Sequence, residues 1–102
     1  CIFNNGYMGM VRQWQELFYG QRYSGSYLKN PNYAEVARAL GAVGITVDRK
    51  EDVPQAVAQM LAEKRPCVVD FRVEQLENVW PMVPAGKSLS EMDGLTILES
   101  LA

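Results

Sequence analysis

An amphipathic helix followed at once by an apolar strand most constrains how this sequence can fold. The segment Glu51–Glu63 repeats apolar residues at helical spacing, and Pro54 lies in the first turn, where a missing N–H does no harm. After Pro66, the run Cys67–Val73 alternates apolar residues, and Val68 makes its second face partly apolar. Such a strand requires a sheet covered on both sides, which is typical of parallel α/β folds. The helical stripe consists of Val53, Ala56, Val57, Met60 and Leu61.

The rest of the chain continues this alternation. Apolar spacing predicts a first helix over Gly9–Phe18, and a Gly-, Ser- and Tyr-rich loop follows over Tyr19–Lys29. A second helix is expected to begin at Asn30-Pro31 and to end at Gly41. The β-branched run Ile45–Val47 predicts a short strand. The apolar stripe of the first helix is Met10, Val11, Trp14, Leu17 and Phe18, and the inward stripe of the second is Tyr33, Val36, Ala37 and Leu40.

The predicted order is therefore strand end, helix, loop, helix, strand, helix and strand, followed by a tail. This order predicts an α/β fold with a partial parallel sheet and flanking helices. Residues 1–73 would form the α/β portion, and residues 74–102 an irregular tail marked by Pro81, Pro84 and Gly86. Because three strands make a thin sheet and the chain lacks an initiator Met, we expect it to be a piece of a longer protein.

Composition excludes several classes of function. The 102 residues carry a net charge of −2 and have a pI near 5.0, which argues against nucleic acid as a partner. No apolar run approaches the ~20 residues that span a bilayer. The absence of His excludes His-containing metal sites and His-dependent nucleophiles within this chain. Cys1 and Cys67 indicate no disulfide framework and favour a reducing, cytoplasmic-type compartment.

The sharpest candidate site follows the first strand end, where two asparagines and a Gly-containing turn lead into a helix over the run Asn4–Met10. Ligands of α/β sheets bind at the carboxyl ends of strands. Asparagine and backbone carbonyl oxygens suit Mg²⁺, and the helix N-terminus beyond them favours a phosphate group. The alternative is a plain turn that uses Asn and Gly only for their backbone conformations.

Several other residues have two interpretations. Met10 and Trp14 share one face of the first helix, where they either pack in a core or line a pocket. Arg12 lies on the polar side of this helix, where it could meet an anion but is expected to sit in water. Asp70 and Arg72 alternate with the apolar face of the last strand and are expected to be solvated or paired at the surface.

Several stretches together resemble one enzyme family. The two asparagines look like the Asn-Asn that closes the thiamine diphosphate motif, Gly-Asp-Gly…Asn-Asn. The run Gly9–Gln15 followed by Leu17-Phe18-Tyr19 resembles the catalytic subunit of acetohydroxyacid synthase, also called acetolactate synthase. The similarity continues to about Met92. The further matching stretches are Arg22-Tyr23-Ser24, Asn30-Pro31, Gly41 and Pro81–Gly86.

The resemblance implies a cofactor site at the first turn. The side-chain oxygen of Asn5 and the backbone carbonyl of Tyr7 would hold Mg²⁺. The third protein ligand, the aspartate of the Gly-Asp-Gly element, is absent from this sequence, and so is any catalytic residue. In this family FAD is bound by a domain outside the matching segment, and an activating glutamate comes from a partner subunit. The residues implied to bind thiamine diphosphate are Asn5, Gly6, Tyr7, Met8, Gly9 and Met10.

The resemblance also implies a substrate channel. The Trp14 equivalent lines the pocket of the second 2-oxo acid, favours 2-oxobutyrate over pyruvate, and stacks on sulfonylurea and imidazolinone herbicides. The segment Phe18–Ser26 would belong to a mobile stretch that closes over the site, with an idle surface loop as the alternative. The run Pro84–Gly86 resembles the channel mouth, with a bare tail as the alternative. The implied channel residues are Met10, Val11, Trp14, Ala85 and Gly86.

The implied reaction decarboxylates pyruvate and joins the two-carbon unit to a second 2-oxo acid, pyruvate or 2-oxobutyrate, on the route to branched-chain amino acids. Such enzymes are homodimers or homotetramers of catalytic subunits, with a small regulatory subunit in some cases, in the bacterial cytoplasm or the plant plastid. One alternative is a noncatalytic α/β fragment with no activity alone. Another is a different thiamine diphosphate-dependent 2-oxo acid decarboxylase or oxidase, against which Trp14 in Gln-Trp-Gln argues.

Overall fold

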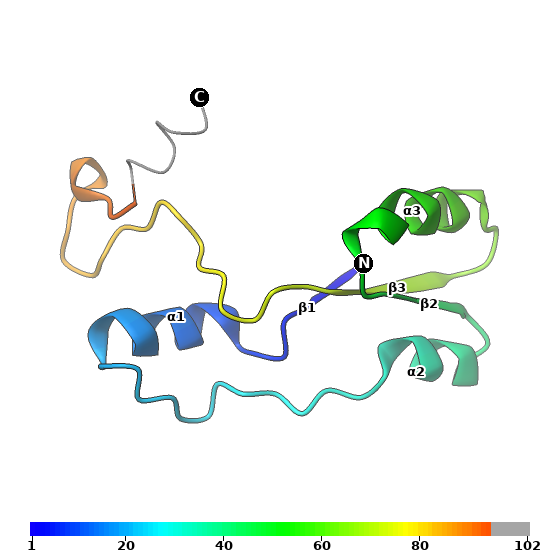
Figure 1. Ribbon diagram of the computed structural model, residues 1–102, viewed down its shortest axis with the longest axis horizontal. Coiled ribbons are helices and arrows are strands. Elements are labelled where there is room, and N and C mark those ends of the chain that lie inside the picture. The colour runs from blue at the N-terminus through cyan, green and yellow to red at the C-terminus, as the bar shows by residue number, and fades with distance from the viewer. Residues whose placement is uncertain (95–102) are drawn as a thin grey trace.

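A computed structural model describes residues 1–94 as a three-stranded sheet with a helix on each face and a further helix beside it (Figure 1). Irregular segments connect the first helix to the second and follow the last strand. The elements are β1 (Ile2–Asn4), α1 (Gly9–Phe18), α2 (Tyr33–Ala39), β2 (Val43–Val47), the 3₁₀ turn η1 (Lys50–Asp52), α3 (Val53–Ala62), β3 (Cys67–Arg72) and the 3₁₀ turn η2 (Leu89–Glu91).

The sheet is parallel throughout, as predicted, and its strand order is β1-β3-β2. Residue Ile2 of β1 pairs with Asp70, and Ile45 of β2 pairs with Val69. The last strand in sequence is thus the central one. This order explains why both faces of β3 are partly apolar, because each face of a central strand is covered.

Helices α3 and α2 lie on opposite faces of the sheet (Figure 1). Under α3, the buried core consists of Val47, Ala56, Val69 and Phe71. On the other face, α2 rests on β2 through buried Ala34 and Ala37. Its approach is so close that a Cβ on Gly44 would lie 2.0 Å from the carbonyl oxygen of Ala34. A glycine on the strand therefore permits this helix to pack.

The structure confirms the type and order of every predicted element and corrects some boundaries. Helix α1 spans the predicted residues, whereas β2 begins two residues earlier than expected. The prediction that Asn30-Pro31 begins the second helix is wrong. The N-cap is Asn32, whose side-chain oxygen accepts a hydrogen bond from the backbone N–H of Glu35 (3.2 Å). The predicted stop at Gly41 is confirmed, since it follows the C-cap with φ of +82°.

Three residues of the predicted stripes of α2 and α3 are exposed. Leu40 is 82% exposed because it lies beyond the last turn of α2. Leu61 is 75% exposed at a flank of α3 that three strands do not cover, although the rest of that stripe packs on the core. In α2, the inward face is made by Ala34 and Ala37 rather than by Val36, because only small side chains fit against β2.

The segment after β3 is irregular up to residue 94, as predicted, apart from η2 and a bridge between Met82 and Asp93. The remainder of the predicted tail, residues 95–102, lies outside the described residues. Cys1 and Cys67 are free thiols.

Candidate functional site

The turn between β1 and α1 is held by its own two asparagines. The Asn4 side-chain oxygen accepts from the backbone N–H of Gly6 (3.2 Å), and the Asn5 oxygen accepts from that of Tyr7 (3.0 Å). Two successive Asx turns thus reverse the chain, with Gly6 at φ of +71°. They fix the Asn5 carboxamide and the Tyr7 peptide close together at the carboxyl end of the strand.

The second oxygen at this turn is the backbone carbonyl oxygen of Tyr7. Tyr7 bridges Tyr27 through the bonds on either side of it, Met8 N–H to the Ser26 oxygen (2.7 Å) and Leu28 N–H to the Gly6 oxygen (2.8 Å). Within residues 1–94, no backbone N–H donates to the Tyr7 oxygen. This oxygen is therefore available to a cation or to water.

The N-terminal end of α1 lies against the same turn. A Cβ on Gly9 would come within 3.1 Å of the Asn5 side-chain nitrogen, so the missing side chain at Gly9 leaves space for the carboxamide. Met8 and Met10 are both exposed. The free backbone N–H groups at the start of this ten-residue helix can face an anion such as a diphosphate.

Asp70 lies behind the turn and corrects a prediction. The sequence places it at the surface, but its exposed fraction is 0% because β3 is the central strand. It accepts from the Asn4 side chain (3.4 Å) and lies 3.5 Å from the Arg72 guanidinium. Asn30 in turn donates to the Asn4 oxygen (2.9 Å). Asn4 is thus a half-buried structural partner whose side chain is engaged by Asp70, Asn30 and Gly6, whereas the Asn5 side chain accepts only from Tyr7 N–H within residues 1–94.

The described residues contain no group of three His, Cys, Asp or Glu side chains arranged to hold a metal ion. A cation at the turn would therefore be held by amide and carbonyl oxygens of this chain, completed by other ligands. The displaced pKa values lie elsewhere, at exposed ion pairs. The hydrogen bond from Arg38 lowers the pKa of Glu35, and the hydrogen bond from Arg65 lowers the pKa of Glu63.

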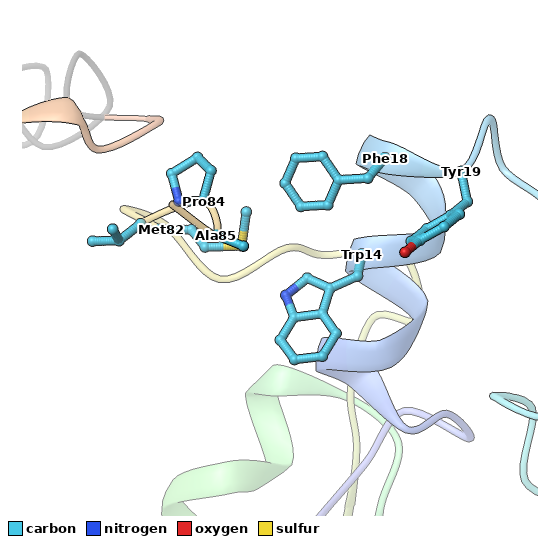
Figure 2. A pocket seen from close by; sticks show the side chains of 7 residues that line it. Trp14, Phe18, Tyr19, Met82, Pro84 and Ala85 are labelled. Carbon is cyan, nitrogen blue, oxygen red and sulfur yellow. The ribbon is translucent and has the colours of Figure 1, made fainter. Parts of the chain in front are cut away.

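A second feature is an apolar pocket of about 520 Å³ between α1 and the segment after β3. Figure 2 shows Trp14 and Phe18 projecting from α1 toward the segment that carries Pro84 and Ala85. We call this pocket the aromatic pocket. Its lining residues are Trp14, Phe18, Tyr19, Met82, Val83, Pro84 and Ala85.

The aromatic pocket joins Trp14 and Ala85, two of the predicted channel residues, across 71 positions of sequence. The other three do not line it: Met10 is exposed, Val11 is half-buried on α1, and Gly86 is exposed at φ of +81°. Sequence reasoning missed Met82 and Val83 as pocket residues, because their spacing carries no signal of what faces them, and it placed Phe18 and Tyr19 only in a stretch that closes over the site.

The buried face of α1 is not the face that carries its apolar stripe. Its buried residues are Arg12 and Gln13, whereas Trp14 and the other large apolar residues are substantially exposed. The expectation that Arg12 sits in water is wrong, since it is fully buried and binds the segment that follows β3. On the opposite side, Gln15 donates to the Ser24 carbonyl (2.7 Å) and accepts from the Ser26 hydroxyl (2.7 Å).

The chain resembles known proteins over most of its length. Residues 1–71 match the family model described as "Thiamine pyrophosphate enzyme, C-terminal TPP binding domain". In the described residues, no helix is both long and apolar enough to cross a membrane.

Three curated relatives share the name acetolactate synthase. The mitochondrial acetolactate synthase of Schizosaccharomyces pombe is 42% identical over 90 residues, which are 88% of this chain and 14% of that protein. The acetolactate synthase large subunit of Parasynechococcus marenigrum is 42% identical over 103 residues, 99% of this chain and 17% of that protein. The large subunit of acetolactate synthase isozyme 2 of Escherichia coli is 44% identical over 92 residues, 89% of this chain and 17% of that protein. The chain thus spans about a sixth of the length of these relatives.

Proposed function

This chain belongs to the thiamine pyrophosphate enzymes, with residues 1–71 in their C-terminal TPP-binding domain, and from this we propose that it is part of an acetolactate synthase. The enzyme would decarboxylate pyruvate and join the two-carbon unit to pyruvate or 2-oxobutyrate. The shared name of the relatives supports this activity over other reactions of the family.

We further propose that the chain works as the C-terminal portion of a longer enzyme. It spans only 14–17% of the length of its relatives. Large apolar side chains at the surface support this proposal, since Phe3 on the outer strand is 76% exposed beside the core residue Phe71. Covering such residues with further sheet and helices would remove apolar surface from water.

The observation that carries the cofactor site is the pair of oxygens at the β1–α1 turn. An amide oxygen has two lone pairs, so the Asn5 oxygen can accept from Tyr7 N–H and still bind a cation. The free Tyr7 carbonyl supplies the second oxygen. Mg²⁺ prefers such oxygens and keeps room for phosphate oxygens and water. The N-terminus of α1 adds N–H groups on the side where a diphosphate would lie.

When bound, thiamine diphosphate supplies the electron sink that lets pyruvate lose CO₂. This chain's contribution is to bind and orient. Asn5 to Met10 hold the cofactor and its metal, and none of these residues moves a proton. Trp14 and the aromatic pocket receive the apolar end of the second 2-oxo acid, whose extra methylene is worth about 1–3 kcal/mol in an apolar pocket.

The remaining parts of the assembly follow from the same family. FAD would bind in a domain outside this chain, and catalytic subunits would associate as homodimers or homotetramers, with or without a small regulatory subunit. The cytoplasm of a bacterium or a plant plastid is the expected compartment, and one relative is named as mitochondrial.

The test is Asn5→Ala in the full-length enzyme. We expect the half-saturating concentrations of Mg²⁺ and thiamine diphosphate to rise together, each by at least about tenfold, because the diphosphate is held through the metal. The matched control is Asn32→Ala, which also removes a side-chain oxygen that accepts from a backbone N–H, but at the cap of α2. Unchanged half-saturation for both ligands in Asn5→Ala would reduce Asn5 to a turn residue.

A further inference from the structure

Two buried polar side chains on α1 hold the segment that carries one wall of the aromatic pocket. We propose that Arg12 and Gln13 are positioning residues that set the width of this pocket, and thereby the choice of the second 2-oxo acid. The inference rests on the proposed function for the identity of that acid. The contact itself is a property of this chain alone.

Gln13 grips the backbone of a single residue. Its side-chain nitrogen donates to the Val79 carbonyl (2.9 Å), and its side-chain oxygen accepts from the Val79 N–H (2.8 Å). The carboxamide thus pairs with both backbone groups of Val79, as a neighbouring β-strand would. Gln13 itself is 1% exposed, so its carboxamide depends on Val79 rather than on water for these bonds.

Arg12 fixes the two residues before that point. Its guanidinium donates to the Glu77 carbonyl (3.1 Å) and to the Asn78 side-chain oxygen. Glu16, one turn further along α1, pairs with the same guanidinium and accepts from the Asn78 nitrogen (3.2 Å). The charge is therefore buried with a partner, and three consecutive residues are tied to one helix face.

We call the contacts of Arg12 and Gln13 with residues 77–79 the clamp. One wall of the aromatic pocket begins three residues after it, at Met82. Met82 is buried, and its sulfur lies 3.5 Å from the Gln13 side-chain nitrogen. Trp14, on the opposite wall, is the residue that follows Gln13 (Figure 2). One wall is thus carried by α1 and the other is fastened to it. A change at Gln13 would let Met82 and Ala85 move relative to the indole without altering any pocket side chain.

The test compares two glutamines of the same helix in the full-length enzyme. Gln13→Leu removes the clamp on Val79, whereas Gln15→Leu removes bonds to Ser24 and Ser26 on the other side. Two quantities are measured. One is amide hydrogen exchange along residues 76–83. The other is the ratio of acetolactate, formed with pyruvate as the second acid, to acetohydroxybutyrate, formed with 2-oxobutyrate, when both acids compete. If Gln13→Leu does not fold, Gln13→Glu, which keeps an acceptor for Val79 N–H, takes its place.

We expect the Gln13 variant to raise exchange at residues 76–83 by about tenfold or more and to change the product ratio. The Gln15 variant should leave exchange at residues 76–83 at its wild-type value, because its bonds go to Ser24 and Ser26. Unchanged exchange would refute the clamp. Faster exchange with an unchanged product ratio would show that the clamp only stabilises the fold, and would overturn its role in specificity. If the wild-type enzyme makes neither product, that result would contradict the proposed function instead. The exchange measurement would still decide whether the clamp exists.

Discussion

Replacing Gly9 with Ala separates helix stability from cofactor binding, because we expect the two to change in opposite directions. Gly9 is the first residue of α1, and alanine favours a helix over glycine by up to about 1 kcal/mol. The new Cβ, however, would lie 3.1 Å from the Asn5 side-chain nitrogen, where ordinary contact begins near 3.4 Å. The carboxamide must then retreat by about 0.3 Å.

That displacement is large for a metal ligand. Coordination distances are held to within about 0.2 Å, and the Asn5 oxygen is already tied to Tyr7 N–H at 3.0 Å. We therefore expect Gly9→Ala to weaken the binding of Mg²⁺ and thiamine diphosphate by about tenfold, a loss typical of disturbed support around a metal site. The fold itself should not become less stable.

The assay is a titration of the metal-free, cofactor-free enzyme with Mg²⁺ and thiamine diphosphate, in a double-mutant cycle with Asn5→Ala. If Gly9 acts through Asn5, the alanine at position 9 should add no further loss once the Asn5 side chain is gone. Losses that add in the double variant would refute the steric route. Wild-type affinity in the single variant would likewise refute the steric route, because the carboxamide would then have moved aside without loss of binding.

Two further changes address the pocket and the sheet. Trp14→Leu should lower the preference for 2-oxobutyrate by roughly ten- to two-hundredfold in a competition assay, because it removes apolar contact with one methylene; a wild-type product ratio with collapsed turnover would instead make Trp14 a core residue. Gly44→Ala should destabilise the packing of α2 on β2 by about 1–3 kcal/mol, since its Cβ would lie 2.0 Å from the Ala34 oxygen. An unchanged midpoint of unfolding in urea would contradict this contact.

The elements of this fold could be predicted because each of them carries its own local signal. Apolar periodicity identified α1 and α3, and β-branched and alternating residues identified β2 and β3. The pair Asn30-Pro31 is a strong local signal for a helix start, yet the Asn30 side chain donates a hydrogen bond to Asn4 instead of capping the helix. A side chain with a partner 26 residues away cannot be recognised by its neighbours in sequence. For the same reason the burial of Asp70 depends on strand order, which the pattern of β3 does not specify.

The same limit explains why α1 buries polar side chains and leaves its apolar stripe largely exposed. A helix is expected to bury its apolar stripe, and α1 buries Arg12 and Gln13 instead. The segment packed on it has no regular structure, so its backbone N–H and C=O groups need side-chain partners, which only a polar helix face can supply. The apolar face with Trp14 and Phe18 is then free to line the aromatic pocket. Helix α1 is thus anchored through its polar face while Trp14 and Phe18 of its apolar face line the pocket, so the hydrophobic pattern predicts the helix correctly but does not say which face is buried.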